Sequence, residues 1–234
     1  MKIALLGYGR MGKEIEQIAL QRGHEIVIKT SGETQYDITE ADVAIDFSTP
    51  TAAYNNISNC FKHHIPVISG TTGWLNQYSE AVALCHENNC GFIYASNFSL
   101  GVTLFFELNK QLARMMTALQ DYDVSIEEIH HTKKLDAPSG TAITIAEGII
   151  SESNKSTWVL DPDSSEHSAI PIKAVRTSDV PGTHTVNYAS EIDSISIQHK
   201  AHNRKGFALG AVIAAEWILN KTGVYTMKDV LNIG

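Results

Sequence analysis

The sequence predicts an α/β fold, in which a parallel sheet covered by helices is followed by a second domain of α+β type. Up to about residue 98, short apolar runs alternate with segments of helical periodicity, the pattern of parallel strands joined by crossover helices. Beyond residue 182, strand-like runs alternate apolar and polar residues, which is typical of strands with one covered face. The chain has 234 residues, 43% of them hydrophobic, which allows one large domain or two modest ones with real cores.

The first strand runs directly into a glycine-rich turn. Residues 3–6 form a continuous apolar run, as in a strand buried on both faces, and residues 7–12 read Gly-Tyr-Gly-Arg-Met-Gly. Helical periodicity follows, and a second strand covers residues 24–28. Strand, Gly-x-Gly-x-x-Gly, helix and strand in this order predict a Rossmann-like dinucleotide-binding domain. The expected cofactor contacts in the turn are Gly7, Tyr8, Gly9, Arg10, Met11 and Gly12.

The end of the second strand bears on the choice of cofactor. An NAD enzyme usually places an acidic residue there for the ribose hydroxyls. This strand ends in Lys29, Thr30 and Ser31 instead, which could accept a 2′-phosphate. The residues favour NADPH, or weak discrimination between NADPH and NADH, while Glu33 or Asp37 remains an alternative acid if it folds back.

Three more strands alternate with helices before residue 98. The expected elements are strand 41–47, helix 51–63, strand 65–69, helix 75–88 and strand 91–95. Gly70-Thr71-Thr72-Gly73 follows the second of these strands, and a polar loop from Ser96 follows the third. Both loops lie at the carboxyl edge, where open α/β sheets bind ligands. Gly70, Thr71 and Thr72 therefore fit a cofactor-binding loop, although an ordinary strand–helix turn has the same pattern.

The second half of the chain mixes helices and strands. We expect a helix at 104–116, a strand at 122–129, a helix at 141–150, a polar loop at 151–167, and strands at 170–176, 183–189 and 192–199. The final helix, 207–221, is apolar nearly all round, so we expect it to be buried against the first sheet. The predicted domains are therefore 1–98 with 204–234, and 99–203.

A reactive loop joins strand 122–129 to the helix that starts near residue 141. It contains His130, His131, two lysines and a Ser-Gly-Thr turn. Histidine exchanges protons near neutral pH, and lysine supplies a fixed positive charge. The start of a helix presents free backbone N–H groups that bind anions. The loop therefore predicts a site that holds a small anion and protonates it.

The composition excludes several other classes of protein. The formal net charge of −8 argues against a nucleic-acid-binding surface. Cys60, Cys85 and Cys90 have no metal-ligand spacing, and we expect no metal site and a reducing compartment. Gly7 and Arg10 interrupt the first apolar run, so the N-terminus is not expected to act as a signal peptide. We expect a soluble cytoplasmic protein without membrane spans.

The reactive loop also carries a family resemblance. Residues 128–141 fit the pattern Glu-x-His-His-x-x-Lys-x-Asp-Ala-Pro-Ser-Gly-Thr of the 4-hydroxy-tetrahydrodipicolinate reductase family, long called dihydrodipicolinate reductases. Segments 7–12, 70–73, 97–99 and 197–201 also fall where that family has motifs. One long pattern and four shorter ones in the same order cover the whole chain, so the resemblance is far more specific than any single motif.

The resemblance implies an NAD(P)H-dependent reduction of 4-hydroxy-tetrahydrodipicolinate to tetrahydrodipicolinate in diaminopimelate and lysine biosynthesis. It implies a homotetramer, in which a substrate domain with a mixed open sheet also builds the oligomer. His130 would be the catalytic acid, Lys134 would assist it, and His131 would contact the substrate. The substrate carboxylate would be held by Ser139, Gly140 and Thr141, and the cofactor would also be contacted by Ala95, Ser96, Asn97 and Phe98. Many members carry an acid where this chain has Ser31, which weakens the case for NAD.

Two other functions remain open at this point. Another NAD(P)-dependent amino-acid or imino-acid oxidoreductase would share the nucleotide domain but not the reactive loop. A nucleotide-sensing protein without turnover would have a degraded loop. Within the loop, Asp136 is expected to shape the turn. For Lys133 two roles remain open: a solvated side chain, or a cation that binds a substrate carboxylate. His184 and His199 are expected to be structural histidines.

Overall fold

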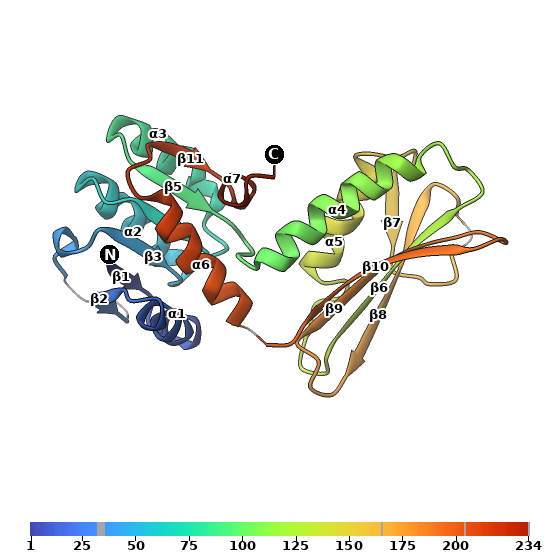
Figure 1. Cartoon of the computed structure of the whole chain (residues 1–234), viewed down its shortest axis with the longest axis horizontal. Coiled ribbons are helices and arrows are strands. Elements are labelled where there is room, and N and C mark those ends of the chain that lie inside the picture. Colours follow the sequence, from blue (N-terminus) through green and yellow to red (C-terminus); the bar gives the residue numbers. More distant parts are fainter. Residues whose placement is uncertain (32–35, 165, 204, 234) are drawn as a thin grey trace. The chain divides into compact units, whose positions relative to one another are not determined.

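The computed structural model describes residues 1–31, 36–164, 166–203 and 205–233. It divides into two compact units, Met1–Leu100 with Lys205–Gly234, and Gly101–Arg204 (Figure 1). Glu33 and the first residue of the predicted C-terminal segment, Arg204, lie outside the described residues. Within the described residues, no helix is both long enough and apolar enough to span a bilayer.

The first unit is built on a six-stranded sheet in the order β11-β5-β4-β3-β1-β2, with every neighbouring pair parallel. Its strands are β1 Lys2–Leu6, β2 Glu25–Thr30, β3 Val43–Asp46, β4 Val67–Ser69, β5 Gly91–Tyr94 and β11 Gly223–Tyr225. Its helices are α1 Arg10–Gln21, α2 Pro50–Lys62, α3 Tyr78–Glu87, α6 Lys205–Ile218 and α7 Met227–Leu231, with 3₁₀ turns at Ile38–Glu40 and Leu75–Gln77. The predicted Rossmann-like parallel sheet is confirmed.

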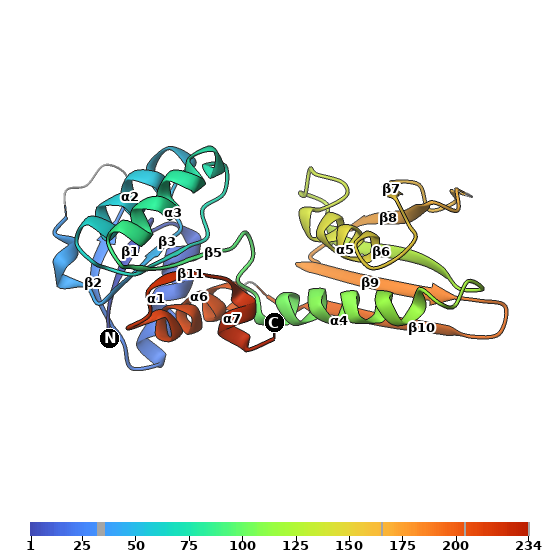
Figure 2. The same cartoon turned by 90° about the horizontal axis from the view of Figure 1, so that it is seen from above.

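Helices cover both faces of this sheet (Figure 2). α1, α6 and α7 pack on one face, through side chains that include Ile15, Val212 and Met227. α2 and α3 cover the other face, through Ile57 and Cys85 among others. Because both faces are covered, nearly all residues of the central strands β1, β3, β4 and β5 are buried, which explains their continuous apolar runs.

The apolar C-terminal helix packs where the sequence indicated. α6 shares its core with β1 and β3 and buries Ala208, Ala211 and Ala215 completely. The helix ends at Ile218, earlier than the predicted residue 221. β11 and α7, which follow it, were not predicted, because each is only three to five residues long.

The second unit contains a five-stranded mixed sheet in the order β10-β9-β6-β8-β7. Its elements are α4 Leu100–Met116, β6 Asp123–His131, α5 Gly140–Ile150, β7 Thr157–Val159, β8 Ala169–Thr177, β9 Gly182–Ala189 and β10 Ser194–Ala201. β6 runs parallel to β8 and antiparallel to β9. The predicted polar loop at 151–167 was partly wrong, since the short strand β7 lies within it and pairs with β8.

Strand β6 leads directly into the reactive loop, and the side chains on its covered face belong to the core of this unit. Its burial alternates along the strand, with Val124 and Ile126 in the core beneath α4 and α5. Side chains two residues apart share one face of a strand. Glu128 and His130 therefore continue the same covered face, and they are buried as well.

The close contact of α6 with the loop after β5 gives a stability test. A Cβ built on Gly210 would lie 1.7 Å from the Phe98 carbonyl oxygen, whereas one on Gly206, in the same helix, would meet only the Ser99 hydroxyl oxygen at 3.5 Å. We predict that Gly210→Ala lowers the free energy of unfolding by about 2–4 kcal/mol, because backbone must move. Gly206→Ala, the matched control, should be neutral or slightly stabilising in urea titrations. Equal stability of the two variants would contradict the packing described.

Candidate active site

The reactive loop is organised around a buried carboxylate, that of Glu128. The side chain has no exposed surface. The Ser139 backbone N–H donates to both carboxylate oxygens at 3.1 Å, and Nη2 of Arg176 donates to Oε1 at 2.9 Å. These donors come from the start of α5 and from β8, so one carboxylate joins three elements of the unit.

Two histidines complete this cluster. Nδ1 of His130 lies 3.3 Å and Nε2 of His184 lies 3.7 Å from Oε2 of Glu128. The two rings are 5.0 Å apart in an edge-to-face arrangement. A Cβ on Gly182 would lie 3.1 Å from Nε2 of His130, so only a glycine at that position leaves this ring nitrogen uncrowded.

The charges of the cluster are balanced. Burial alone raises the pKa of Glu128, but the contacts from His130, His184, Ser139 and Arg176 outweigh it and hold the pKa well below its ordinary value. Burial also lowers the pKa of His184, which favours its neutral form. An ionised Glu128 therefore forms an ion pair with the Arg176 cation, with little exposure of either side chain to water.

The Ser-Gly-Thr turn forms the amino end of α5. The Ser139 hydroxyl accepts from the Ala142 N–H at 3.2 Å as the N-cap, and it lies 3.2 Å from Nε2 of His184. Gly140 is exposed, and a Cβ there would meet nothing within 4 Å. The first turn of α5 is therefore open to an anion at Gly140 and Thr141.

Lys134 and Asp136 hold each other within the loop. Nζ of Lys134 lies 2.9 Å from a carboxylate oxygen of Asp136, and this hydrogen bond lowers the pKa of Asp136. The Asp136 carbonyl accepts from Nη2 of Arg176 at 2.6 Å. Asp136 thus contacts two cations, which fits the expectation that it shapes the turn.

The structure separates the two neighbouring histidines. His130 shares the covered face of β6 with Glu128, while strand alternation places His131 on the opposite face. His131 is half-buried, and its Nδ1 has no hydrogen-bond partner among the described residues. The structure therefore brings His130 and Ser139 together but does not place His131 beside them.

Sequence reasoning missed two members of the cluster. Arg176 was not singled out, and His184 was expected to be structural. Their signal lies in the strand register, where Arg176 pairs with His130 and His184 pairs with Glu128. Register between distant strands cannot be read from local patterns. His199, the other histidine expected to be structural, stacks against Phe105 with ring centroids 6.0 Å apart.

The same cluster is the place among the described residues where a metal ion could be held. Ligand atoms of Glu128, His130 and His184 lie within 4.8 Å of one another. Arg176 already supplies the positive charge that a metal ion would bring to the carboxylate. Nδ1 of His130 and Nδ1 of His184 are buried without a hydrogen-bond partner among the described residues.

In the first unit, the three glycines of the turn have different surroundings. Gly7 has φ +101°, and its Cβ would lie 2.1 Å from the Phe47 carbonyl oxygen, while a Cβ on Gly12 would lie 2.4 Å from the Gly7 carbonyl oxygen. A Cβ on Gly9 would meet nothing within 4 Å. A pyrophosphate-binding turn requires a tight bend, which Gly7 makes, close packing of the helix, which Gly12 allows, and open backbone, which Gly9 offers. The turn therefore fits a dinucleotide.

A second buried carboxylate, that of Asp46, fixes the loop after β4. It accepts hydrogen bonds from the hydroxyls of Ser48, Ser69 and Thr71 and from the amide of Asn56, at 2.7–3.1 Å. Burial raises the pKa of Asp46, while these hydrogen bonds favour its ionised form. The Thr71 hydroxyl is thereby occupied, and only the backbone of Thr71 is left for a ligand.

The other predicted cofactor residues differ in how they are exposed. Phe98 is buried in the core of the unit, with its ring 5.8 Å from that of Phe47. A Cβ on Gly70 would lie 2.3 Å from the Phe47 ring. Oδ1 of Asn97 accepts from the Ser99 N–H at 2.8 Å, and Thr72 is exposed. The side chain of Phe98 therefore belongs to the core, and the Phe47 ring leaves no room for a side chain at position 70.

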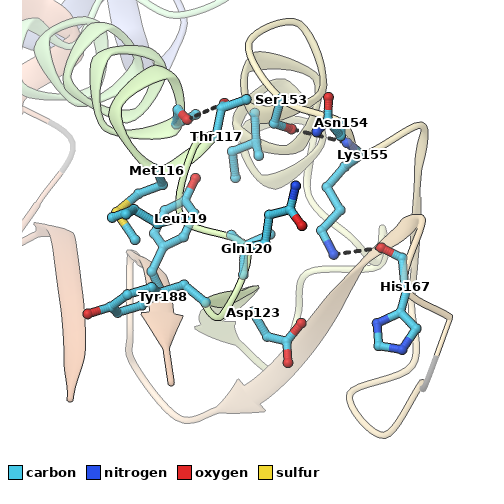
Figure 3. A pocket seen from close by; sticks show the side chains of 14 residues that line it. Met116, Thr117, Leu119, Gln120, Asp123, Ser153, Asn154, Lys155, His167 and Tyr188 are labelled. Atoms are coloured by element: carbon cyan, nitrogen blue, oxygen red, sulfur yellow. Dashed lines mark hydrogen bonds between the residues drawn. The ribbon is translucent and has the colours of Figure 1, made fainter. Parts of the chain in front are cut away.

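A cavity of about 310 Å³ lies between the ends of α4 and α5 and the start of β6 (Figure 3). Core side chains such as Met116 and Ile149 line it, together with Lys155, whose Nζ donates to the His167 carbonyl at 2.7 Å. Burial raises the pKa of the Tyr188 hydroxyl, which also lines the cavity, to about 12. None of the predicted site residues lines this cavity, and we assign it no part in the site.

Comparisons with known proteins show the family to which the chain is related. Family models described as dihydrodipicolinate reductase, N-terminus, and dihydrodipicolinate reductase, C-terminus, match residues 1–98 and 101–231. The 4-hydroxy-tetrahydrodipicolinate reductase of Christiangramia forsetii is 58% identical and aligns over 99% of this chain and 98% of its own length. The protein of the same name from Neisseria gonorrhoeae is 34% identical over 93% of this chain and 84% of its own length.

Solved structures share the fold. The dipicolinate-bound dihydrodipicolinate reductase from Paenisporosarcina sp. TG-14 matches 97% of each chain with a TM-score of 0.81 at 23% identity. A probable dehydrogenase from Thermotoga maritima matches all of this chain and 93% of its own with a TM-score of 0.57 at 9% identity. At these identities the likeness concerns the fold alone.

The buried carboxylate makes stability depend on pH. The folded pKa of Glu128 is lowered, so its stabilising contribution is present above the ordinary glutamate pKa of about 4.3 and is lost as the pH falls further. We predict that Glu128→Gln lowers the free energy of unfolding by about 3 kcal/mol at pH 7, because Arg176 is left without its carboxylate. Urea titrations at several pH values should show that this difference between wild type and variant becomes smaller below about pH 4.3.

Glu127→Gln is the matched control for this prediction. Glu127 pairs with Lys173 at 2.9 Å on partly exposed side chains, and such a pair contributes about 0.2–1 kcal/mol. A pH-independent loss in Glu128→Gln, or an equal loss in both variants, would contradict the ionised cluster.

Proposed function

This chain belongs to the dihydrodipicolinate reductase family, since the two family models together match nearly its whole length, and on that premise we propose how its residues carry out the reaction. The chain is an oxidoreductase of diaminopimelate and lysine biosynthesis, and its family reduces 4-hydroxy-tetrahydrodipicolinate. We infer that the product is tetrahydrodipicolinate, with a hydride from NADPH or NADH and a proton from His130.

The first unit holds the cofactor in this proposal. A bound reduced nicotinamide dinucleotide supplies the hydride. The open backbone at Gly9 and the free N–H groups at the start of α1 receive the pyrophosphate, which is supported by the space above Gly9. The remaining contacts come from Gly7, Tyr8, Arg10, Met11, Gly12, Ser31, Gly70, Thr71, Thr72, Ala95, Ser96, Asn97 and Phe98.

The second unit binds the substrate, a cyclic dicarboxylate. Backbone N–H groups at Gly140 and Thr141 hold one carboxylate at the start of α5, with Ser139 fixing that turn as its N-cap. Lys134 adds a positive charge, which its contact with Asp136 orients. His131 lies on the opposite face of β6 from His130, so a contact of His131 with the substrate is supported by the family resemblance alone.

The proton is delivered by His130, and one observation carries this assignment. The ring is only 7% exposed and stands beside an ionised carboxylate that is itself balanced by Arg176. A hydride added to the substrate leaves an electron pair that must be protonated, and a histidine can donate that proton near neutral pH. Glu128 orients the ring through the 3.3 Å contact between its Oε2 and Nδ1 of His130.

We predict that His130→Gln lowers the turnover number by about two to four powers of ten, because general acid catalysis is lost. The affinity for NADPH and NADH should be unchanged, since His130 lies in the second unit. Turnover is followed by the oxidation of each cofactor, with substrate generated by the preceding enzyme of the pathway.

His63→Gln serves as the control for this experiment. His63 is an exposed residue at the end of α2, where its ring nitrogen lies 2.9 Å from the Asn59 carbonyl. Near-normal turnover in His130→Gln would remove His130 from the acid role, and no oxidation of either cofactor by the unmodified chain would overturn the function itself.

A homotetramer built by the second unit, working in the cytoplasm, is part of the same proposal. α4 and α5 cover one face of the mixed sheet, and strand alternation places Thr185, Asn187, Ser196 and Gln198 on the other. These side chains pair across β9 and β10, with Ser196 donating to Asn187 at 2.6 Å and Gln198 to Thr185 at 2.9 Å. The three buried free cysteines suit a reducing compartment.

The oligomer is tested by sedimentation. We predict a species of four times the 25.6 kDa chain mass, and its dissociation by Ser196→Lys, which places a charge on the polar face. A monomeric wild-type protein would contradict the proposal.

A further inference from the structure

The end of β2 lies directly beside the glycine turn. Lys29 pairs with Leu5 in the parallel register of β2 and β1, and Thr30 pairs with Leu6. In dinucleotide-binding folds, the residues at this strand end face the ribose of the adenosine half. A carboxylate there favours the 2′-hydroxyl of NADH, and a cation favours the 2′-phosphate of NADPH.

Two of the side chains that could accept a 2′-phosphate are already engaged. The Thr30 hydroxyl is buried and accepts from the Gly7 N–H at 3.3 Å, so it supports the turn. Lys29 forms an ion pair with Glu16, which projects from α1. The strand end therefore does not offer the free cation that its sequence indicates.

Glu16 is held in place from two sides. The Lys29 ammonium contacts its Oε1, and the Tyr8 hydroxyl donates to its Oε2. Nζ of Lys29 also lies 5.2 Å from the centre of the Tyr8 ring. Tyr8 belongs to the glycine turn itself, so the carboxylate is fixed next to the nucleotide site.

Both partners of this pair are charged at neutral pH. The hydrogen bond to Glu16 raises the pKa of Lys29, and the hydrogen bonds from Lys29 and Tyr8 lower the pKa of Glu16. The side chain of Glu16 is 17% exposed and that of Lys29 is 41% exposed. An incoming phosphate would meet a neutral pair rather than an isolated ammonium group.

We propose that Glu16 is a specificity-determining residue, which neutralises Lys29 and so lets the chain use NADH at least as well as NADPH. The inference rests on the proposed function, because it concerns the cofactor of that reaction. A 2′-phosphate carries nearly two negative charges, and its attraction to Lys29 is offset by repulsion from Glu16. The ribose hydroxyl of NADH is uncharged and is not repelled. Since the pair is partly solvated, the effect on selectivity should be about tenfold.

The test measures dissociation constants for NADPH and NADH from cofactor fluorescence, together with kcat/KM for each, on the full chain. In the wild type, the dissociation constant for NADPH should be equal to or larger than that for NADH. Glu16→Gln should improve NADPH binding relative to NADH about tenfold by releasing Lys29. Adding Lys29→Met to Glu16→Gln should abolish the gain, which isolates the pairwise effect.

Two single variants serve as controls for the change in net charge. Glu25→Gln removes the same charge at the opposite end of β2, where the side chain is exposed, and should leave the ratio unchanged. Glu33→Gln removes the acid that the sequence offered as an alternative, and it should also leave the ratio unchanged.

Four results would overturn the inference: a wild type that binds NADPH more tightly than NADH, an unchanged ratio in Glu16→Gln, a larger shift in either control, or a chain that binds neither nucleotide. Failure of the proposed function gives a different result, in which both nucleotides bind but neither is oxidised with the substrate.

Discussion

The arrangement of the second unit depends on one interaction, the pairing of the buried Glu128 carboxylate with Arg176. A carboxylate without exposed surface is costly to keep ionised, and its charge must be met by donors that surround it. Those donors come from β8 and from the start of α5, while β9 contributes His184. Satisfying one charge therefore fixes the relative positions of four elements, and His130 lies among them on β6.

The first unit also contains a buried carboxylate that fixes a loop, but its hydrogen-bond donors are different. Asp46 is also a buried carboxylate at the end of a strand, but neutral hydroxyls and an amide surround it, and no cation contacts it among the described residues. It joins the ends of β3 and β4 and holds Thr71. In both units, a buried carboxyl group at the end of a strand holds a polar loop in place, which gives a site the precision that loops alone lack.

Features that depend on local patterns in the sequence were predicted correctly, whereas features that depend on contacts between distant residues were missed. The alternation of apolar runs with helical segments and the glycine spacing at Gly7 to Gly12 are local patterns, and they predicted the parallel sheet. The apolar run of α6 predicted that this helix is buried. β7, β11 and α7 are too short to show a pattern in the sequence. Pairing with other strands stabilises β7 and β11. Arg176, His184 and the Glu16–Lys29 pair depend on register and side-chain direction, which only the folded chain defines.

The two adjacent histidines illustrate how the fold limits what a motif can mean. A motif suggests that His130 and His131 act together, but consecutive side chains of a strand point to opposite faces. His130 enters the charged cluster, whereas His131 faces the side of the sheet that carries the polar residues of β9 and β10. Nδ1 of His131 is buried without a hydrogen-bond partner among the described residues, as are Nδ1 of His130 and Nδ1 of His184. The two histidines therefore lie on two faces of one strand, and of the two only His130 lies beside the Glu128 carboxylate.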